Sequence, residues 1–139
     1  MKTSYYSAAA KLDRKKYFLV RTSIGSPRFL KCDYSMQTIA PDQDFLSLDE
    51  MDYKREYSKK LTRLGSVALA KEVSEIQKMA GKKEVVFLCF ESLSPENVEN
   101  GQFCHRRIFA KWWERKTGES IDELPAPSKK PRLIQLGLF

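Results

Sequence analysis

The segment EVVFLCFE, residues Glu84 to Glu91, is the clearest indication of fold class in this chain. Six consecutive apolar residues stand between its two glutamates, and four of the six are β-branched or aromatic. Such side chains favour a strand. An uninterrupted apolar run, in place of alternation, indicates a strand covered on both faces, as in a parallel sheet. The segment therefore predicts an α/β domain.

Two further strands and three helices are predicted around this strand. The strand segments are Lys2–Ser7 and Lys16–Ser23, and the helical segments are Met51–Leu64, Ser66–Lys83 and Cys104–Gly118. Their order along the chain predicts a small layered α/β/α domain around a short, mainly parallel sheet. Between residues 28 and 49 the pattern predicts loop with short elements.

Apolar periodicity predicts which helix faces are buried. In the second helix Gly81 is the expected C-cap. The expected buried face consists of Val67, Ala70, Val73, Ile76 (or Gln77) and Ala80, flanked by Leu69 and Met79. In the third helix the apolar stripe ends in the pair Trp112-Trp113. Such a pair is more typical of a core than of a platform on which bases stack.

Composition is that of a folded, basic protein. Of 139 residues 42% are hydrophobic, and the net charge is +7. This charge favours a polyanionic partner such as nucleic acid or a nucleotide. Apolar runs fall short of the roughly 20 residues that span a bilayer, and the first residues lack the apolar middle of a signal peptide. We therefore expect a cytoplasmic protein without a membrane partner.

The three cysteines, Cys32, Cys89 and Cys104, are an odd count at wide spacings. They indicate no disulfide framework, as is usual in a reducing compartment. Together with His105 they make up a set of four zinc ligands in principle. A C-x-x-C pair, the common mark of structural zinc sites, does not occur. The sequence therefore predicts neither a metal nor a cofactor.

Polar residues follow two of the predicted strands. Arg21, Ser23 and Ser26 come at the end of one, and Glu91 ends the other. The last helix then opens with Cys104, His105 and Arg106. His105 is the only histidine of the chain. Because ligands bind at the carboxyl ends of parallel strands, Glu91, His105 and Arg106 are expected to converge in one cleft.

Each residue of this arrangement has more than one possible chemical role. The N-terminus of the helix and Arg106 form an anion site, or Arg106 lies on a solvated face. Cys104 is either a thiolate activated by the helix end or a small buried apolar residue. Glu91 either orients His105 or acts itself as an acid or base. His105 can equally be a surface or capping residue.

The segment VVFLCFES…CHRRIFAKWWERKTG resembles the signature of the domain of unknown function 488 family: a buried strand ending in Cys-x-Glu, a loop, and Cys-His-Arg opening a helix. TSYYS, LVRTSIGSPRF and YKREYSKKL are similar to earlier elements of that family, so the resemblance covers residues 2–124. It implies a compact α/β domain in which Glu91, Cys104, His105 and Arg106 are grouped at one site. We take these four as the candidate catalytic residues, although the resemblance does not imply a reaction. Weaker candidates for the same cleft are Arg21, Ser26 and Tyr57.

The chain ends in QLGLF after a segment that is rich in proline and lysine. We therefore divide it into a domain of residues 1–124 and an extended linker and tail of residues 125–139. The ending resembles the peptide motif by which bacterial and phage proteins bind the DNA sliding clamp. The matching residues are Gln135, Leu136, Leu138 and Phe139. Alternatively, the tail is a last strand packed on the chain's own sheet.

Three basic residues lie in the linker, namely Lys129, Lys130 and Arg132, and we expect them near the DNA that a clamp encircles. The remaining excess of four positive charges on residues 1–124 predicts weak, non-specific binding of nucleic acid. These features predict a clamp-docked, DNA-associated protein whose domain acts on nucleic acid or a nucleotide. Base or nucleotide processing is the expected class, with glycosidic repair chemistry as one option. The rival prediction is a non-catalytic clamp ligand that modulates or inhibits replication, as in a phage.

Overall fold

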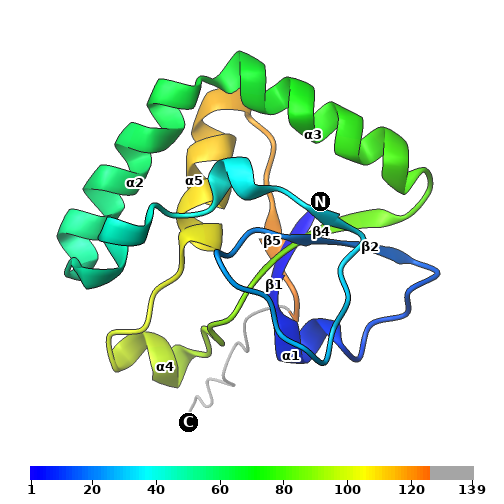
Figure 1. The fold of residues 1–139 in the computed structure, drawn as a ribbon, viewed down its shortest axis with the longest axis horizontal. Coiled ribbons are helices and arrows are strands. Elements are labelled where there is room, and N and C mark those ends of the chain that lie inside the picture. Colours follow the sequence, from blue (N-terminus) through cyan, green and yellow to red (C-terminus); the bar gives the residue numbers. More distant parts are fainter. Residues whose placement is uncertain (126–139) are drawn as a thin grey trace, which may run out of the picture.

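A computed structural model describes residues 1–125, the side chain of residue 95 excepted. Five strands form one sheet in the order β3-β2-β4-β1-β5, and every adjacent pair is parallel (Figure 1). The strands are β1 (Lys2–Tyr5), β2 (Tyr17–Arg21), β3 (Tyr34–Ser35), β4 (Glu84–Cys89) and β5 (Asp122–Glu123). The α/β fold class and the parallel sheet are confirmed.

The predicted central strand, β4, lies in the middle of this sheet. Its side chains alternate between two apolar clusters: Val85 and Phe87 join the larger one, and Val86 and Leu88 join the smaller one on the opposite face. Each of these four residues is at most 3% exposed. The uninterrupted apolar run therefore exists because both faces of β4 are covered.

The long helices α2, α3 and α5 cover one face of the sheet, while the short α1 lies at the other (Figure 1). The helical segments are α1 (Tyr6–Ala9), η1 (Gln37–Ile39), η2 (Gln43–Ser47), α2 (Glu50–Leu64), α3 (Ser66–Ala80), α4 (Pro95–Glu99) and α5 (His105–Thr117). Within the described residues, no helix combines the length and apolar character needed to cross a bilayer.

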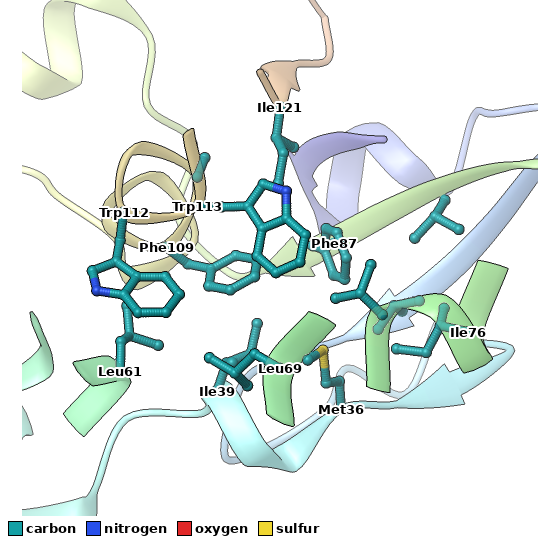
Figure 2. Close-up of a cluster of buried hydrophobic side chains, with 14 of the residues drawn as sticks. Met36, Ile39, Leu61, Leu69, Ile76, Phe87, Phe109, Trp112, Trp113 and Ile121 are labelled. Carbon is teal, nitrogen blue, oxygen red and sulfur yellow. The ribbon is translucent and has the colours of Figure 1, made fainter. Parts of the chain in front are cut away.

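The tryptophan pair of α5 belongs to the larger core cluster. Trp112 and Trp113 are 2% and 4% exposed, and they pack with Phe109, Leu61 and Ile121 (Figure 2). The prediction that this pair is core is confirmed. The helix ends at Gly118, whose φ of 79° lies in the left-handed region that glycine adopts without strain.

The buried face of α3 differs from the prediction. Leu69, Val73, Ile76 and Ala80 are buried, whereas Val67 is 84% exposed. Spacings of four, three and four residues keep a stripe aligned on a helix of 3.6 residues per turn, while repeated spacings of three drift around it. The flanking Leu69 is therefore a core residue.

Short elements lie in the loops. Between residues 28 and 49 the structure has β3, η1 and η2, in agreement with the prediction of loop with short elements, while α4 in the loop after β4 and β5 after α5 were not predicted. β5 is two residues long and pairs with Lys2 and Thr3 of β1. This short pairing carries Glu123 to the base of the candidate site, next to α5.

Candidate functional site

A cleft of about 430 Å³ opens at the carboxyl ends of β2 and β4, beside the first turn of α5. Residues from five segments line it, among them Ser23, Ile24, Gly25, Pro41, Leu46, Leu48, Tyr53, Cys89, Phe90, Glu91, Gly101, Gln102, Phe103, Cys104 and His105. The structure thus brings Glu91, Cys104 and His105 to one cleft. They meet because parallel strands end at the same edge of the sheet and α5 begins there.

His105 is held in one tautomer by backbone. Its Nε2 lies 2.9 Å from the carbonyl oxygen of Thr22 and 3.1 Å from the Thr22 hydroxyl. That hydroxyl donates its hydrogen to the carbonyl of Leu88, 2.8 Å away. Since a carbonyl only accepts, Nε2 carries the proton and Nδ1 is left as an acceptor. Nδ1 lies 3.6 Å from Sγ of Cys104.

The imidazole of His105 is neutral at physiological pH. Burial lowers its pKa to about 4, and the nearby charges of Arg106 and Lys60 act in the same direction, against the hydrogen bond to Thr22. The ring is 4% exposed and packs edge-on against Tyr57. His105 is therefore neither a surface residue nor a cation, and the loss of this buried, bonded side chain affects the fold as well as the cleft.

Glu91 lines the cleft with a half-buried carboxylate. Sγ of Cys89 lies 3.6 Å from Oε1 of Glu91. The carbonyl of Thr22 orients the imidazole of His105. Of the two roles considered for Glu91, orientation of His105 is therefore wrong. The carboxylate also faces Tyr53, whose pKa is raised by burial and, to a smaller extent, by Glu91. Glu91 thus remains the acidic group of the cleft.

Cys89 and Cys104 lie side by side at the floor of the cleft, with their sulfurs at bonding distance. Their Cα atoms are 7.5 Å apart, and their residues are 1% and 4% exposed. The wide sequence spacing of the cysteines concealed this pair, because strand end and helix start meet only in the fold. Cys32 is separate: it packs against the smaller apolar cluster.

Arg106 is a buried structural cation, contrary to the expectation of a free anion-binding group. The residue is 0% exposed. Its guanidinium donates from Nη2 and Nε to the two carboxylate oxygens of Glu123, at 2.6 and 3.2 Å. Nη1 donates to Sγ of Cys89 at 2.8 Å and to the carbonyl of Glu91 at 2.7 Å. Arg106 therefore binds β5 and the end of β4 to α5 from beneath the cleft.

The three weaker candidates also lie outside the lining of this cleft. Arg21 donates to the carbonyls of Ile24 and Gly25, and with Ser26 it lines a separate depression near β3. Tyr57 is 0% exposed and donates its hydroxyl proton to the carbonyl of Ile39 at 2.5 Å. Arg21 shapes the turn after β2, and Tyr57 supports the ring of His105 from the core.

Replacing Tyr57 by phenylalanine should lower the free energy of unfolding by about 1–3 kcal/mol, because the buried carbonyl of Ile39 loses its donor. Ligand binding in the cleft should change less than twofold. Urea titration and calorimetry of the same preparation measure both. A large loss of binding at unchanged stability would instead place the hydroxyl in the functional machinery.

Several lining residues carry no sequence signal of their role. Tyr53, Phe90 and Phe103 form aromatic walls, but they come from α2 and from the two ends of the loop between β4 and α5. Glu123 follows Arg106 by 17 residues, and only the pairing of β5 with β1 brings it back. Of the polar residues after β2, only Ser23 enters the cleft.

The remaining predicted residues lie outside the described part of the chain. They are the clamp-motif residues Gln135, Leu136, Leu138 and Phe139 and the basic residues Lys129, Lys130 and Arg132. Comparison of the chain with protein-family models, with curated proteins and with solved structures finds no match. The resemblance to the domain of unknown function 488 family therefore stays a prediction.

Proposed function

We propose that this chain is a DNA-associated protein that binds a nucleobase or nucleoside in the cleft and docks on the sliding clamp through its C-terminal motif. The observation that carries the first half is the composition of the cleft. Aromatic walls from Tyr53, Phe90 and Phe103 offer faces on which a base stacks. Ser23 and Glu91 supply polar groups for the edges of the base.

The charge of the lining favours the base over the phosphate. Among the described lining residues there is no lysine and no arginine. The guanidinium groups of Arg106 and Arg21 next to the lining are held by Glu123 and by the carbonyls of Ile24 and Gly25. The positive end of α5 points to the cleft, but it is a partial charge. A neutral base or nucleoside, or a base turned out of a DNA strand with its phosphates outside, therefore fits better than a free nucleotide.

The motif QLGLF carries the second half of the proposal. It stands at the end of the chain, beyond Pro125, Pro127 and Pro131, which favour an extended linker. Leu138 and Phe139 provide apolar anchors, and Gln135 provides hydrogen bonds for orientation. Such a tether raises the effective concentration of the domain at DNA that carries a clamp.

The test of the cleft compares Glu91→Gln with Glu96→Gln, an exposed residue of α4 outside the cleft lining. Calorimetric titrations use free nucleosides and a short single-stranded oligonucleotide. A hydrogen bond to a charged group contributes about 1.5–3 kcal/mol, so Glu91→Gln should weaken binding at least tenfold while Glu96→Gln leaves it unchanged. Equal affinities for both variants, or no binding of either probe to the wild type, would refute the cleft proposal.

One observation favours the second candidate, a non-catalytic clamp ligand. Of the four predicted catalytic residues, Arg106 uses its guanidinium in internal hydrogen bonds and His105 uses Nε2 in one. A clamp ligand needs only the tail, so a peptide of residues 125–139 would inhibit clamp-dependent DNA synthesis as well as the full chain. A requirement for the domain in such an assay would count against this candidate.

A further inference from the structure

Three metal-ligating atoms converge at the floor of the cleft. Sγ of Cys89, Sγ of Cys104 and a ring nitrogen of His105 all lie within 4.8 Å of one another. Zinc–ligand bonds of about 2.0–2.3 Å place the ligands of a tetrahedral site roughly 3.3–3.8 Å apart. We propose that Cys89, Cys104 and His105 bind a zinc ion, with a fourth position open to the cleft.

The hydrogen bonds of His105 suit it to this role. Nε2 donates to the backbone carbonyl of Thr22, which leaves Nδ1 with its lone pair, 3.6 Å from Sγ of Cys104. A carbonyl or carboxylate partner on the second ring nitrogen is the usual second contact of histidines that bind zinc.

The surroundings of the cysteines favour thiolates. Nη1 of Arg106 donates to Sγ of Cys89 at 2.8 Å, and Cys104 occupies the N-cap of α5, where the helix dipole is positive. Two thiolates balance the charge of Zn²⁺, and Arg106 is itself balanced by Glu123. The buried site would therefore be close to neutral.

The backbone separation distinguishes a shared metal from a disulfide. Cα atoms of disulfide-bonded cysteines usually lie 4.4–6.8 Å apart, and bridging beyond about 7 Å requires the backbone to move. Cys89 and Cys104 are separated by 7.5 Å. Zinc binding requires the two sulfurs, at bonding distance in the structure, to turn apart to roughly 3.3–3.8 Å, and the wide backbone spacing favours that arrangement.

The cleft supplies the fourth position. Oε1 of Glu91 lies 3.6 Å from Sγ of Cys89, so this carboxylate either completes the tetrahedron or faces a water that does. Three protein ligands with one exchangeable position characterise catalytic zinc sites. That the open position serves a bound base rests on the proposed function; the zinc site itself does not.

The absence of a C-x-x-C pair led the sequence prediction away from a metal. In the fold, the ligands come from the end of β4 and the start of α5, which are separated by the loop that carries α4. Cys32, the fourth ligand considered from the sequence, does not belong to the cluster. Cys32→Ser is therefore the matched control.

The experiment measures zinc by elemental mass spectrometry in protein purified without chelator. We expect one zinc per wild-type and per Cys32→Ser chain, and less than a tenth of that in Cys89→Ser and Cys104→Ser. In reduced, metal-stripped wild type, Co²⁺ should bind with a thiolate-to-cobalt charge-transfer band and the visible bands of four-coordinate cobalt. If the serine variants do not fold, the Co²⁺ titration of the wild type tests the metal site by itself.

Two results would overturn the proposal. One is zinc-free protein whose intact mass is two hydrogens below that of the reduced chain, which indicates a disulfide, together with no Co²⁺ binding after reduction. The other is zinc that stays in both Cys89→Ser and Cys104→Ser. Nucleoside titrations on the same samples separate the two proposals: zinc without nucleoside binding refutes the proposed function alone, and nucleoside binding without zinc refutes the metal site alone.

Discussion

Replacing Leu138 and Phe139 by alanine is expected to abolish binding of the full chain to a bacterial sliding clamp. Burial of a leucine and a phenylalanine contributes roughly 1.5–3 kcal/mol each, and ordering the tail offsets part of this. Wild-type affinity should therefore be micromolar, and the double variant should bind at least about 100-fold more weakly. Isothermal titration measures the affinity, and a melting curve of each sample measures the fold.

The same tail provides the control. Leu133 precedes the motif, so Leu133→Ala should weaken clamp binding less than threefold. The melting temperature should be the same for all three proteins, because we propose that the motif binds the clamp's pocket and does not pack in the core of this chain. A markedly earlier transition in the double variant would instead assign the tail to the chain's own sheet, and the clamp prediction would be wrong.

Arg106→Met should lower the free energy of unfolding by about 3–5 kcal/mol. This substitution keeps much of the side-chain volume but removes the shortest ion pair of the Glu123 carboxylate, which is 9% exposed. Removing one partner of a buried ion pair lowers the free energy of unfolding this much because the charge of the other partner remains buried without compensation. Urea unfolding followed by circular dichroism gives the change in free energy.

Arg107 serves as the matched control for Arg106. It is the next residue of α5, its side chain is 32% exposed, and its Nε lies 3.6 Å from the same carboxylate. Arg107→Ala should cost less than about 1 kcal/mol, because its guanidinium is partly exposed and its contact with Glu123 is long. Arg106→Met with Glu123→Gln should cost less than the sum of the two single changes. Equal losses for the Arg106 and Arg107 variants would contradict a structural role for Arg106.

The candidate site could be predicted in outline from local sequence. Glu91 and Cys104-His105 stand next to a strand and a helix that patterning identifies well, and parallel topology then requires their ends to meet. The partners of these residues could not be predicted in the same way. Thr22, Glu123 and Tyr53 contact the site across long sequence separations, and no local pattern encodes such a pairing.

Arg106 illustrates the limit most clearly. At the start of a helix, an arginine is expected to be solvated or to attract an anion. In the fold, β5 supplies a carboxylate from 17 residues further along the chain, and the guanidinium becomes a buried ion pair. A two-residue strand thus changed the role of Arg106 from anion binding to a structural ion pair. Such a strand is too short to be recognised from apolar periodicity.

The sequence alone determined the α/β class, the central strand β4 and the long helices, because each follows from a repeat of apolar residues that acts locally. It also contains the C-terminal motif, whose residues need no fold to be recognised. The close approach of Cys89, Cys104 and His105, and the burial of Arg106 against Cys89, became visible only in the tertiary structure. Both depend on where separate elements come together, and that is set by burying several apolar faces at once.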